Sequence, residues 1–182
     1  MDAPRSKKEA RPIRVVTVDD VLEGELQVGA GLRTLDDLNL VTQRFVMLHS
    51  PKSIRKSGEF ESGPVAINKN SILFVCELDE PALLVDRPIK RFSCATVRLQ
   101  LLQWEIEGFV HVPPGGAPLK RFDQERHPFV SLTSALVTEG DEGETAAFVA
   151  VNCIYVSTAQ AIGKTKEPRA VATAGSGSVR SR

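Results

Sequence analysis

Apolar and polar residues alternate along several short stretches of this chain, a pattern typical of β-strands with one buried face. The clearest stretch is residues 104–112, and residues 97–101 and 21–28 follow the same pattern. Runs of β-branched and aromatic residues predict further strands at 15–18, 45–48, 65–67, 72–75, 129–132, 148–151 and 154–156. The pattern therefore predicts a mainly β fold.

This pattern occurs twice. At an offset of 84 residues, residues 15–68 align with residues 99–152 without a gap, and 12 of the 54 pairs are identical. Chance would give roughly 6 % identity, or about three pairs. A two-residue gap is then expected to extend the match from residues 71–74 to residues 153–156. The repeat predicts a tandem duplication of one domain type.

One short helix is predicted in each repeat. Thr34, followed by Asp36 and Asp37, is typical of a helix N-terminus, where acidic residues complement the helix dipole. In the second repeat, Pro118 stands where it can begin a helix. The apolar residues expected to face inward are Leu35, Leu38, Leu119 and Phe122.

We expect each repeat to form a small β-barrel-like unit, and the two copies to associate, because about 65 residues is near the lower limit for an independent core. The expected organisation is a disordered basic arm (1–14), a first β domain (15–78), a packed linker (79–92), a second β domain (93–160) and a disordered basic tail (161–182). A closed barrel and an open sheet both fit this pattern.

Eight residues shared by the two repeats are expected to hold the fold. Gly24 and Gly108 fit a bend or bulge where a small sheet curls. Asn68 and Asn152 end strands, where asparagine commonly shapes a turn. The residues expected in the core are Phe45, Leu48, Phe129 and Leu132.

The net charge of zero conceals an uneven distribution. Residues 1–14 carry +3 and residues 161–182 carry +4, so residues 15–160 carry −7. Basic ends can attract nucleic acid or an anionic surface, although solvated ends have the same composition. The residues that could bind such an anion are Lys7, Lys8, Arg11, Arg14, Lys164, Lys166 and Arg169.

The cysteines and the apolar runs bear on location. Cys76, Cys94 and Cys153 are odd in number and lack Cys-x-x-Cys spacing, which favours reduced thiols. No apolar run approaches the roughly 18 residues of a membrane span, and the charged N-terminus is not followed by the apolar region of a secretory signal. We therefore expect a cytoplasmic protein.

Candidate chemistry is sparse. His49, His111 and His127 are not repeated and have no partners at metal-ligand spacing, so surface positions are expected for them. Ser50 and Ser134 are more typical of turns than of nucleophiles. The sequence thus predicts no catalytic, metal-binding or cofactor-binding residue, and no cofactor.

The sequence Gly-Lys-Thr at residues 163–165 resembles the end of a phosphate-binding loop. That loop requires a glycine five residues before Gly163, where Thr158 stands. The motif is therefore rejected.

Residues of the second repeat carry two family resemblances. Its order of a strand with Gly108, a bend, Asp123, residues 129–135 and residues 151–154 resembles the small Sm-like barrels that bind RNA. The chain is also similar to a group of small bacterial β-rich domains with a proline/glycine turn, a short Leu-rich helix and a Val-Asn-x-x-Ile ending. The matching residues are Gly108, Pro113, Pro114, Phe122, Phe129, Leu132, Thr133, Ala135, Val151, Asn152 and Ile154. This second resemblance covers both repeats, with His49 and Pro51 at the Thr133 and Ala135 positions, and implies no known activity.

The leading expectation is a non-catalytic interaction or scaffold protein that binds a protein partner or itself. The alternative is a nucleic-acid-binding, Sm-like protein that uses its basic tails. An enzyme would need a site assembled between the repeats. The sequence does not identify the partner, the oligomeric state or the biological process.

Overall fold

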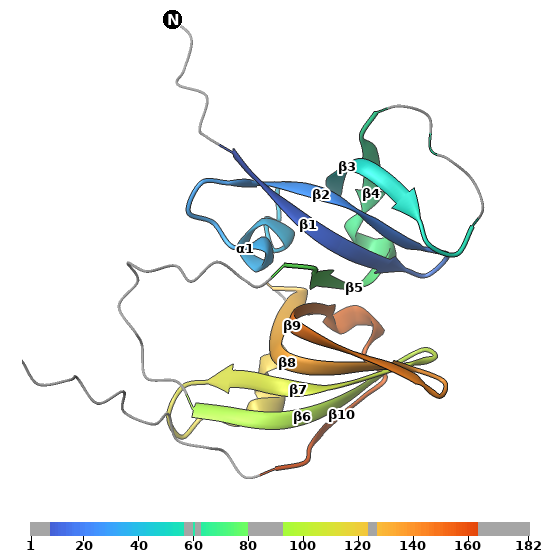
Figure 1. The fold of residues 1–182 in the computed structure, drawn as a ribbon. Coiled ribbons are helices and arrows are strands. Elements are labelled where there is room, and N and C mark those ends of the chain that lie inside the picture. The colour runs from blue at the N-terminus through green and yellow to red at the C-terminus, as the bar shows by residue number, and fades with distance from the viewer. Residues whose placement is uncertain (1–7, 57–59, 61–62, 80–92, 124–126, 164–182) are drawn as a thin grey trace, which may run out of the picture.

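The computed structural model describes residues 8–56, 60, 63–79, 93–123 and 127–163. In these ranges, ten strands form one antiparallel sheet in the order β10-β6-β7-β8-β9-β5-β1-β2-β3-β4. Figure 1 shows β1–β5 in the upper half of the molecule and β6–β10 in the lower half. The strands are β1 (Lys8–Thr17), β2 (Val21–Gly29), β3 (Phe45–Ser53), β4 (Val65–Asn68), β5 (Ile72–Glu77), β6 (Ser93–Leu101), β7 (Trp104–Val112), β8 (Phe129–Glu139), β9 (Glu142–Asn152) and β10 (Thr158–Ala161). The prediction of a mainly β fold is confirmed.

The helical segments are short. They are the α-helix α1 (Thr34–Leu38) and the 3-10 turns η1 (Lys69–Ser71), η2 (Pro118–Arg121) and η3 (Cys153–Tyr155). Leu35 and Leu38 of α1 are buried, as predicted, whereas Leu119 of η2 is exposed against prediction. None of the helices in the described ranges is long and apolar enough to cross a membrane.

Two groups of five strands make up the sheet. The first unit, β1–β5, has the strand order β5-β1-β2-β3-β4, and the second unit, β6–β10, has the order β10-β6-β7-β8-β9. Their registers also correspond at the 84-residue offset. Phe45 is opposite Asn68 as Phe129 is opposite Asn152, and Val15 is opposite Val75 as Leu99 is opposite Ala159.

Each unit has a register shift at a glycine, Gly24 in the first and Gly108 in the second, and these two glycines stand at matching positions. The β2–β3 ladder shifts between Glu23 and Glu25, and the β7–β8 ladder shifts between Glu107 and Phe109. A Cβ on Gly24, which lies between the first two, would approach the His49 carbonyl oxygen to 2.6 Å. The strand opposite each shift has a serine, Ser50 or Ser134, with φ of 48°. The shift therefore needs a residue without a side chain on β2.

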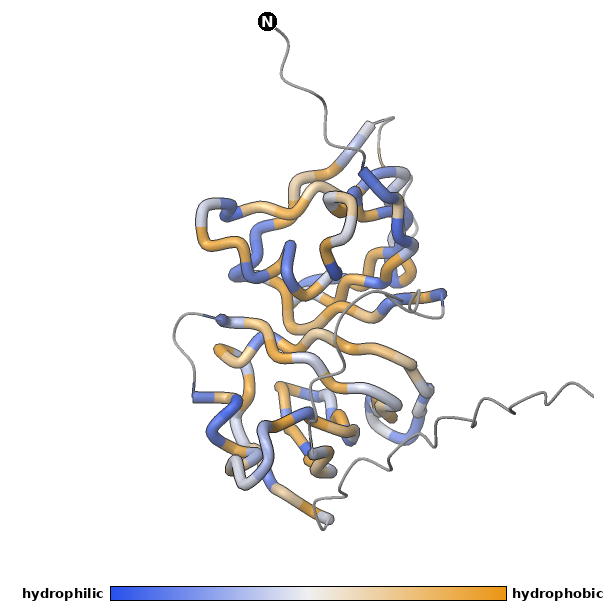
Figure 2. The backbone as a smooth tube through the Cα atoms, turned by 90° about the vertical axis from the view of Figure 1, so that its left-hand side faces the viewer, coloured by the Kyte–Doolittle hydropathy of each residue, from blue (hydrophilic) through white to orange (hydrophobic). Residues whose placement is uncertain are grey.

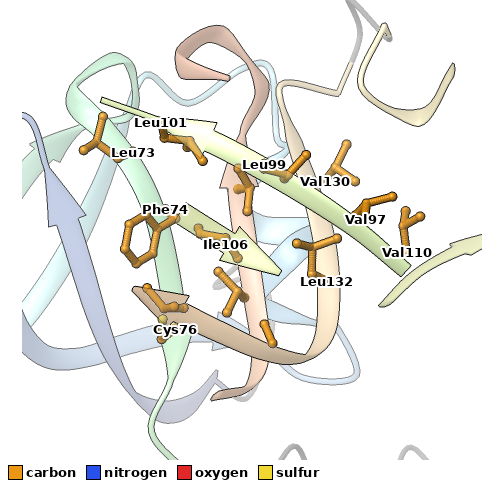
Figure 3. Packing of buried hydrophobic residues seen from close by; sticks show 14 of the residues in the cluster. Leu73, Phe74, Cys76, Val97, Leu99, Leu101, Ile106, Val110, Val130 and Leu132 are labelled. Atoms are coloured by element: carbon orange, nitrogen blue, oxygen red, sulfur yellow. The ribbon is translucent and has the colours of Figure 1, made fainter. Parts of the chain in front are cut away.

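Two buried clusters form the core, and each contains residues from both units. One cluster joins Leu99, Ile106 and Leu132 of the second unit to Leu73 and Phe74 of β5, as Figure 3 shows. The other combines residues of the first unit with residues of β8 and β9. Its members from those two strands are Phe129, Phe148 and Ala150.

The units meet where β5 pairs with β9. Phe74, Val75 and Cys76 lie opposite Val151, Ala150 and Val149. Both strands are buried on both faces along this ladder, and Figure 2 shows hydrophobic residues along the strands in the middle of the molecule. We call this contact, with the α1 and η1 residues beside it, the junction.

The prediction of a disordered arm over residues 1–14 is wrong for residues 8–14. These residues belong to β1, which lies between β2 and β5 in the sheet. Ile13 is fully buried, and Arg11 and Arg14 make ion pairs. Main-chain pairing with β2 along the whole segment, and with β5 from Ile13 onward, orders residues whose charges and proline show no alternating pattern.

The predicted end of the second domain also needs correction. Residues 154–156, expected as a strand, lie largely in η3, and the last strand is β10, which ends at Ala161. Because the β6–β10 register keeps the 84-residue offset, the expected two-residue gap is absent from the structure. Residues 80–92 of the predicted linker and residues 164–182 of the tail lie outside the described residues.

Candidate interaction surface

Asn39, which ends α1, binds the first residue of β8. Its side-chain oxygen accepts from the Phe129 N–H at 3.0 Å, and its Nδ2 donates to the Phe129 carbonyl at 2.9 Å. Phe129 lies beyond the end of the β7–β8 ladder. The first unit thus satisfies main-chain groups at the start of β8 that the second unit's ladder does not reach.

Asn152 makes the corresponding connection from the end of β9. Its Nδ2 donates to the carbonyls of Lys69, at 3.2 Å, and Ile72, at 2.9 Å, while its Oδ1 accepts from the Ile154 N–H at 3.3 Å. The side chain is buried. Asn152 therefore shapes its own turn and binds the first unit at the same time.

These contacts cover one face of the second unit. We define the β8–β9 face as Phe129, Ser131, Ala150 and Asn152, which lie on one side of the two paired strands. Three of the four are buried, and Ser131 is half-buried. The β8–β9 face is therefore the surface by which the second unit binds the first.

The equivalent face of the first unit is open. We define the β3–β4 face as Phe45, Met47, Ala66 and Asn68, which pair across β3 and β4 in the same register. All four are exposed. Three of its residues are identical to those of the β8–β9 face, and the exception is methionine in place of serine.

The prediction that Phe45 is buried is wrong for this reason. Phe45 is 51 % exposed, whereas Phe129 at the matching position is 2 % exposed. Leu48 and Leu132 are fully buried, as predicted. What buries Phe129 is the neighbouring unit, and no described part of the chain lies in the same place over Phe45.

A cavity of about 380 Å³ adjoins the β3–β4 face. Phe45, Met47 and Leu40 line it, with polar residues including Gln43 and His49. Val41, next along the chain, is 79 % exposed. An exposed apolar surface beside a strand whose outer edge pairs with no strand in the described ranges, as for β4, is typical of a binding site.

The second unit has a partly open face on the side that corresponds to the junction side of the first, where Leu119 and Asp123 are exposed while Phe122 and Ala159 are half-buried against the second unit's own cluster. We define the β10 face as Leu119, Phe122, Asp123 and Ala159, which stand 84 residues after Leu35, Leu38, Asn39 and Val75. Leu35 is 9 % exposed at the junction, whereas Leu119 is 42 % exposed. Asp123 is also exposed, where Asn39 binds Phe129.

Polar contacts add to the junction. Arg14 bonds Glu23 within the first unit, with its Nε at 2.9 Å, and also bonds Glu144 of the second unit. Arg55 bonds Glu139 across the units, and the Tyr155 hydroxyl donates to the Asn70 carbonyl. These exposed pairs orient the two units more than they stabilise them.

Ion pairs within the protein engage two of the predicted anion-binding residues, Arg11 and Arg14. Arg11 is within 3.5 Å of Glu77 and bonds the Leu32 carbonyl at 2.9 Å, and Arg14 is held by two glutamates. Lys8 is the first residue of β1. The other candidates, Lys7, Lys164, Lys166 and Arg169, lie outside the described residues.

His111 is half-buried, against the prediction of a surface position, and it links three strands. Its Nδ1 is 3.3 Å from the Cys94 sulfur, and its Nε2 is 3.0 Å from the Thr133 hydroxyl. Burial lowers the pKa of His111, and the positive charge of Arg121 lowers this pKa further. A neutral ring with both nitrogens bonded cross-links the outer side of β6, β7 and β8.

Two of the thiols in the described ranges are held in the protonated form. Burial raises the pKa of the Cys76 thiol to about 12 and of the Cys153 thiol to about 11, so neither supplies a thiolate near neutral pH. Among the described residues, no group of histidine, cysteine and acidic side chains could hold a metal ion.

A second cavity, of about 430 Å³, lies between α1 and the second unit. Arg33, Arg121, His127 and Asn39 line it together with apolar residues. Arg33 already bonds Asp36, with Nη2 at 2.9 Å from the carboxylate. The cavity holds mixed charge and gives no single ligand chemistry.

Comparison with known proteins gives no relative. No protein-family model, no curated protein and no solved structure matches this chain.

The sequence analysis missed the open surface, although a signal for it was present. Phe45, Ala66 and Asn68 lie on one face of two paired strands and match their counterparts in the second repeat. Sequence identity between the repeats by itself favours a role inside one unit. The structure shows that these positions in the second repeat contact another unit instead.

Proposed function

We propose that this chain is a non-catalytic interaction protein whose binding site is the β3–β4 face together with the unpaired edge of β4. The observation that carries the proposal is the contrast between two matching faces, because the β8–β9 face binds a neighbouring unit while the β3–β4 face is exposed. A partner strand added to β4 would gain main-chain hydrogen bonds, and Phe45 and Met47 would supply apolar contact.

We also propose that each unit is a small, partly open barrel and that the two units arose by tandem duplication. The support is the shared offset of four ladders, two glycine-centred register shifts and two serines with positive φ. On this view the chain consists of two interaction units, one of which is already occupied by the other.

The nucleic-acid alternative receives less support from the described residues. Arg11 and Arg14 were two of its proposed ligands, and both are bound to glutamates. No exposed row of aromatic side chains for base stacking is present in the described ranges, where Phe45 is the aromatic residue on the β3–β4 face.

The proposal is tested by affinity capture from cell extract with the full chain, its Phe45→Asp variant and a control variant, Leu136→Asp. Leu136 is 45 % exposed and lies on the second unit, away from the β3–β4 face. We expect Phe45→Asp to lose a partner that the wild type and the control both retain, and nuclease treatment to leave binding unchanged. Equal binding by all three proteins would contradict the proposed site.

A further inference from the structure

We propose that the β3–β4 face binds the β10 face of a second copy of this chain, so that the protein assembles head to tail. This inference rests on the proposed function and names its partner. The junction already shows, within one chain, how two such units join.

The faces that would meet are the counterparts of faces that already meet. At the junction, β5 of the first unit pairs with β9 along the edge of the β8–β9 face, and Asn39, next to α1, bonds Phe129 of that face. At the 84-residue offset, β10 of the second unit is the counterpart of β5, and the β3–β4 face of the first unit is the counterpart of the β8–β9 face. Both counterparts lie at opposite ends of the ten-stranded sheet. A contact between different faces of identical chains is heterologous, and it repeats from one chain to the next.

Along β4 and β10, successive main-chain N–H groups point alternately toward the neighbouring strand and toward the open edge, as pairing with a further strand requires. The Lys69 N–H bonds the carbonyl of Arg44, the residue before β3, so by alternation the Ala66 N–H points away from β3 toward the open edge. The Ile162 N–H bonds the Thr96 carbonyl on the β6 side, so the Ala159 N–H points toward the other open edge.

The junction register then predicts the register of the new ladder. Val75 pairs with Ala150 at the junction, and the counterparts of these two residues are Ala159 and Ala66. Both N–H groups point outward, so the two alanines can exchange a pair of hydrogen bonds as an antiparallel strand pair requires. The outward N–H groups of β10 and β4 therefore lie at the positions that the junction register requires.

Side chains on the two faces match less completely. Leu119 and Phe45 are exposed apolar residues at positions whose counterparts, Leu35 and Phe129, are buried at the junction. Asp123 can accept from the Phe45 N–H, as Asn39 accepts from Phe129, but its carboxylate has no donor for the Phe45 carbonyl.

The new contact is also more polar than the junction. The residues of β10 are Thr-Ala-Gln-Ala, whereas β5 contributes Leu73, Phe74 and Cys76 to a buried cluster. We therefore expect an association that is reversible and depends on protein concentration, unlike the junction within the chain.

The test uses full-length variants in which one edge is blocked. Ala66→Pro removes the outward N–H of β4, and Ala159→Pro removes that of β10, without removing a donor to β3 or β6. Ala66→Ser and Ala159→Ser are the matched controls, because serine keeps both N–H groups. Sedimentation velocity over a wide range of concentration reports the size of each protein, and circular dichroism reports its folding.

We expect the wild type and both serine controls to form species larger than the monomer, and each proline variant alone to be monomeric. An equimolar mixture of the two proline variants is expected to form a 1:1 dimer, because each retains the face that the other lacks. If a proline variant does not fold, Phe45→Glu and Leu119→Glu replace it, since both side chains are exposed. Each is expected to weaken the association by about tenfold or more.

Three results would overturn the proposal. They are a monomeric wild type at all concentrations, dimers formed by one proline variant alone, which would indicate contact between identical faces, and a mixture that stays monomeric. If the wild type is monomeric while Phe45→Asp still loses a captured partner, the self-association fails but the proposed function stands. If the chain assembles while capture is unaffected by Phe45→Asp, the β3–β4 face serves only self-association.

Discussion

Asn68 and Asn152 hold the same position in the two units and make different numbers of contacts. Each side-chain oxygen accepts an N–H two residues ahead, from Asn70 or Ile154, which shapes the turn after the strand. Asn152 alone, of the two, is buried and bonds two carbonyls of the other unit. Both asparagines shape the turn after their strand, and the further bonds of Asn152 exist because the first unit lies beside it.

Replacing each asparagine by alanine is expected to separate these roles. Asn152→Ala should lower the free energy of unfolding by about 1–3 kcal/mol, because it leaves buried carbonyl groups without donors. Asn68→Ala should cost about 1 kcal/mol or less, since its site is exposed. Urea unfolding of both variants measures the difference, and equal losses would show that the buried bonds of Asn152 add nothing.

His111 gives the folded protein a pH dependence of defined sign. Its pKa is lowered in the folded state by burial and by Arg121, so the unfolded chain binds the proton more readily. Stability from this group is present above the unfolded pKa of about 6.5 and falls as the pH drops below it. His111→Gln should reduce the loss of stability between about pH 7 and pH 5.5 in denaturant titrations. An unchanged pH profile would contradict this assignment.

At the level of elements, the register shift at Gly24 and Gly108 sets how β2 and β7 bend. A Cβ on Gly24 would lie 2.6 Å from a main-chain oxygen, whereas on Gly108 it would lie 3.1 Å from the Ala135 side chain. The Ala135 Cβ moves only with its main chain, so both glycines face fixed atoms, and the shorter distance at Gly24 demands the larger shift. The two glycines therefore occupy matching positions with unequal tolerance.

Gly24→Ala is expected to lower the free energy of unfolding by about 1–3 kcal/mol, and Gly108→Ala by less, because overpacking near main chain forces the ladder to shift. Gly143→Ala is a matched control in another strand, where the added Cβ would make an ordinary contact at 3.4 Å. Thermal and urea unfolding of the three variants rank them. A larger effect at Gly108 than at Gly24 would contradict the expected order.

The sequence predicted the positions of the strands better than it predicted which strands lie next to each other. Alternation and β-branched runs located β2, β3, β6, β7 and β8, because each shows one buried face within its own residues. The prediction of a strand at residues 154–156 is wrong because the apolar Ile154 and Tyr155 resemble a strand in sequence, although Ile154 is exposed. The β5–β9 pairing left no local pattern, since strands buried on both faces do not alternate.

The candidate site was beyond sequence reasoning for a similar reason. Apolar character at Phe45 is compatible with a core or with an interface, and the sequence does not state which. The choice depends on whether a neighbouring unit lies over the residue. That information exists only in the arrangement of the two units.

At the scale of the whole molecule, the shared cores make the two units depend on each other. Leu73 and Phe74 of the first unit pack with the second, and Phe129 and Phe148 of the second pack with the first. Separating the units would expose β5 and β9, which are both buried on two faces. The units are therefore expected to unfold together.

Calorimetry can test this cooperativity. We expect a single unfolding transition for the full chain, with equal calorimetric and van't Hoff enthalpies. Leu73→Ala should shift that whole transition to lower temperature, because a buried leucine lost from the shared cluster costs about 2–5 kcal/mol. Two resolved transitions, with only one of them shifted, would show that the units are independent.

Because β5 and β6 belong to one chain, the contact between the two units is intramolecular, unlike a contact between separate chains. Two units on one chain meet at an effective concentration that is commonly in the millimolar range for short linkers. The junction consequently forms at any dilution, whereas contacts of the same design between separate chains obey mass action. In the proposed assembly, occupancy of the β3–β4 face therefore varies with the concentration of this protein or of a competing ligand, while the junction stays closed.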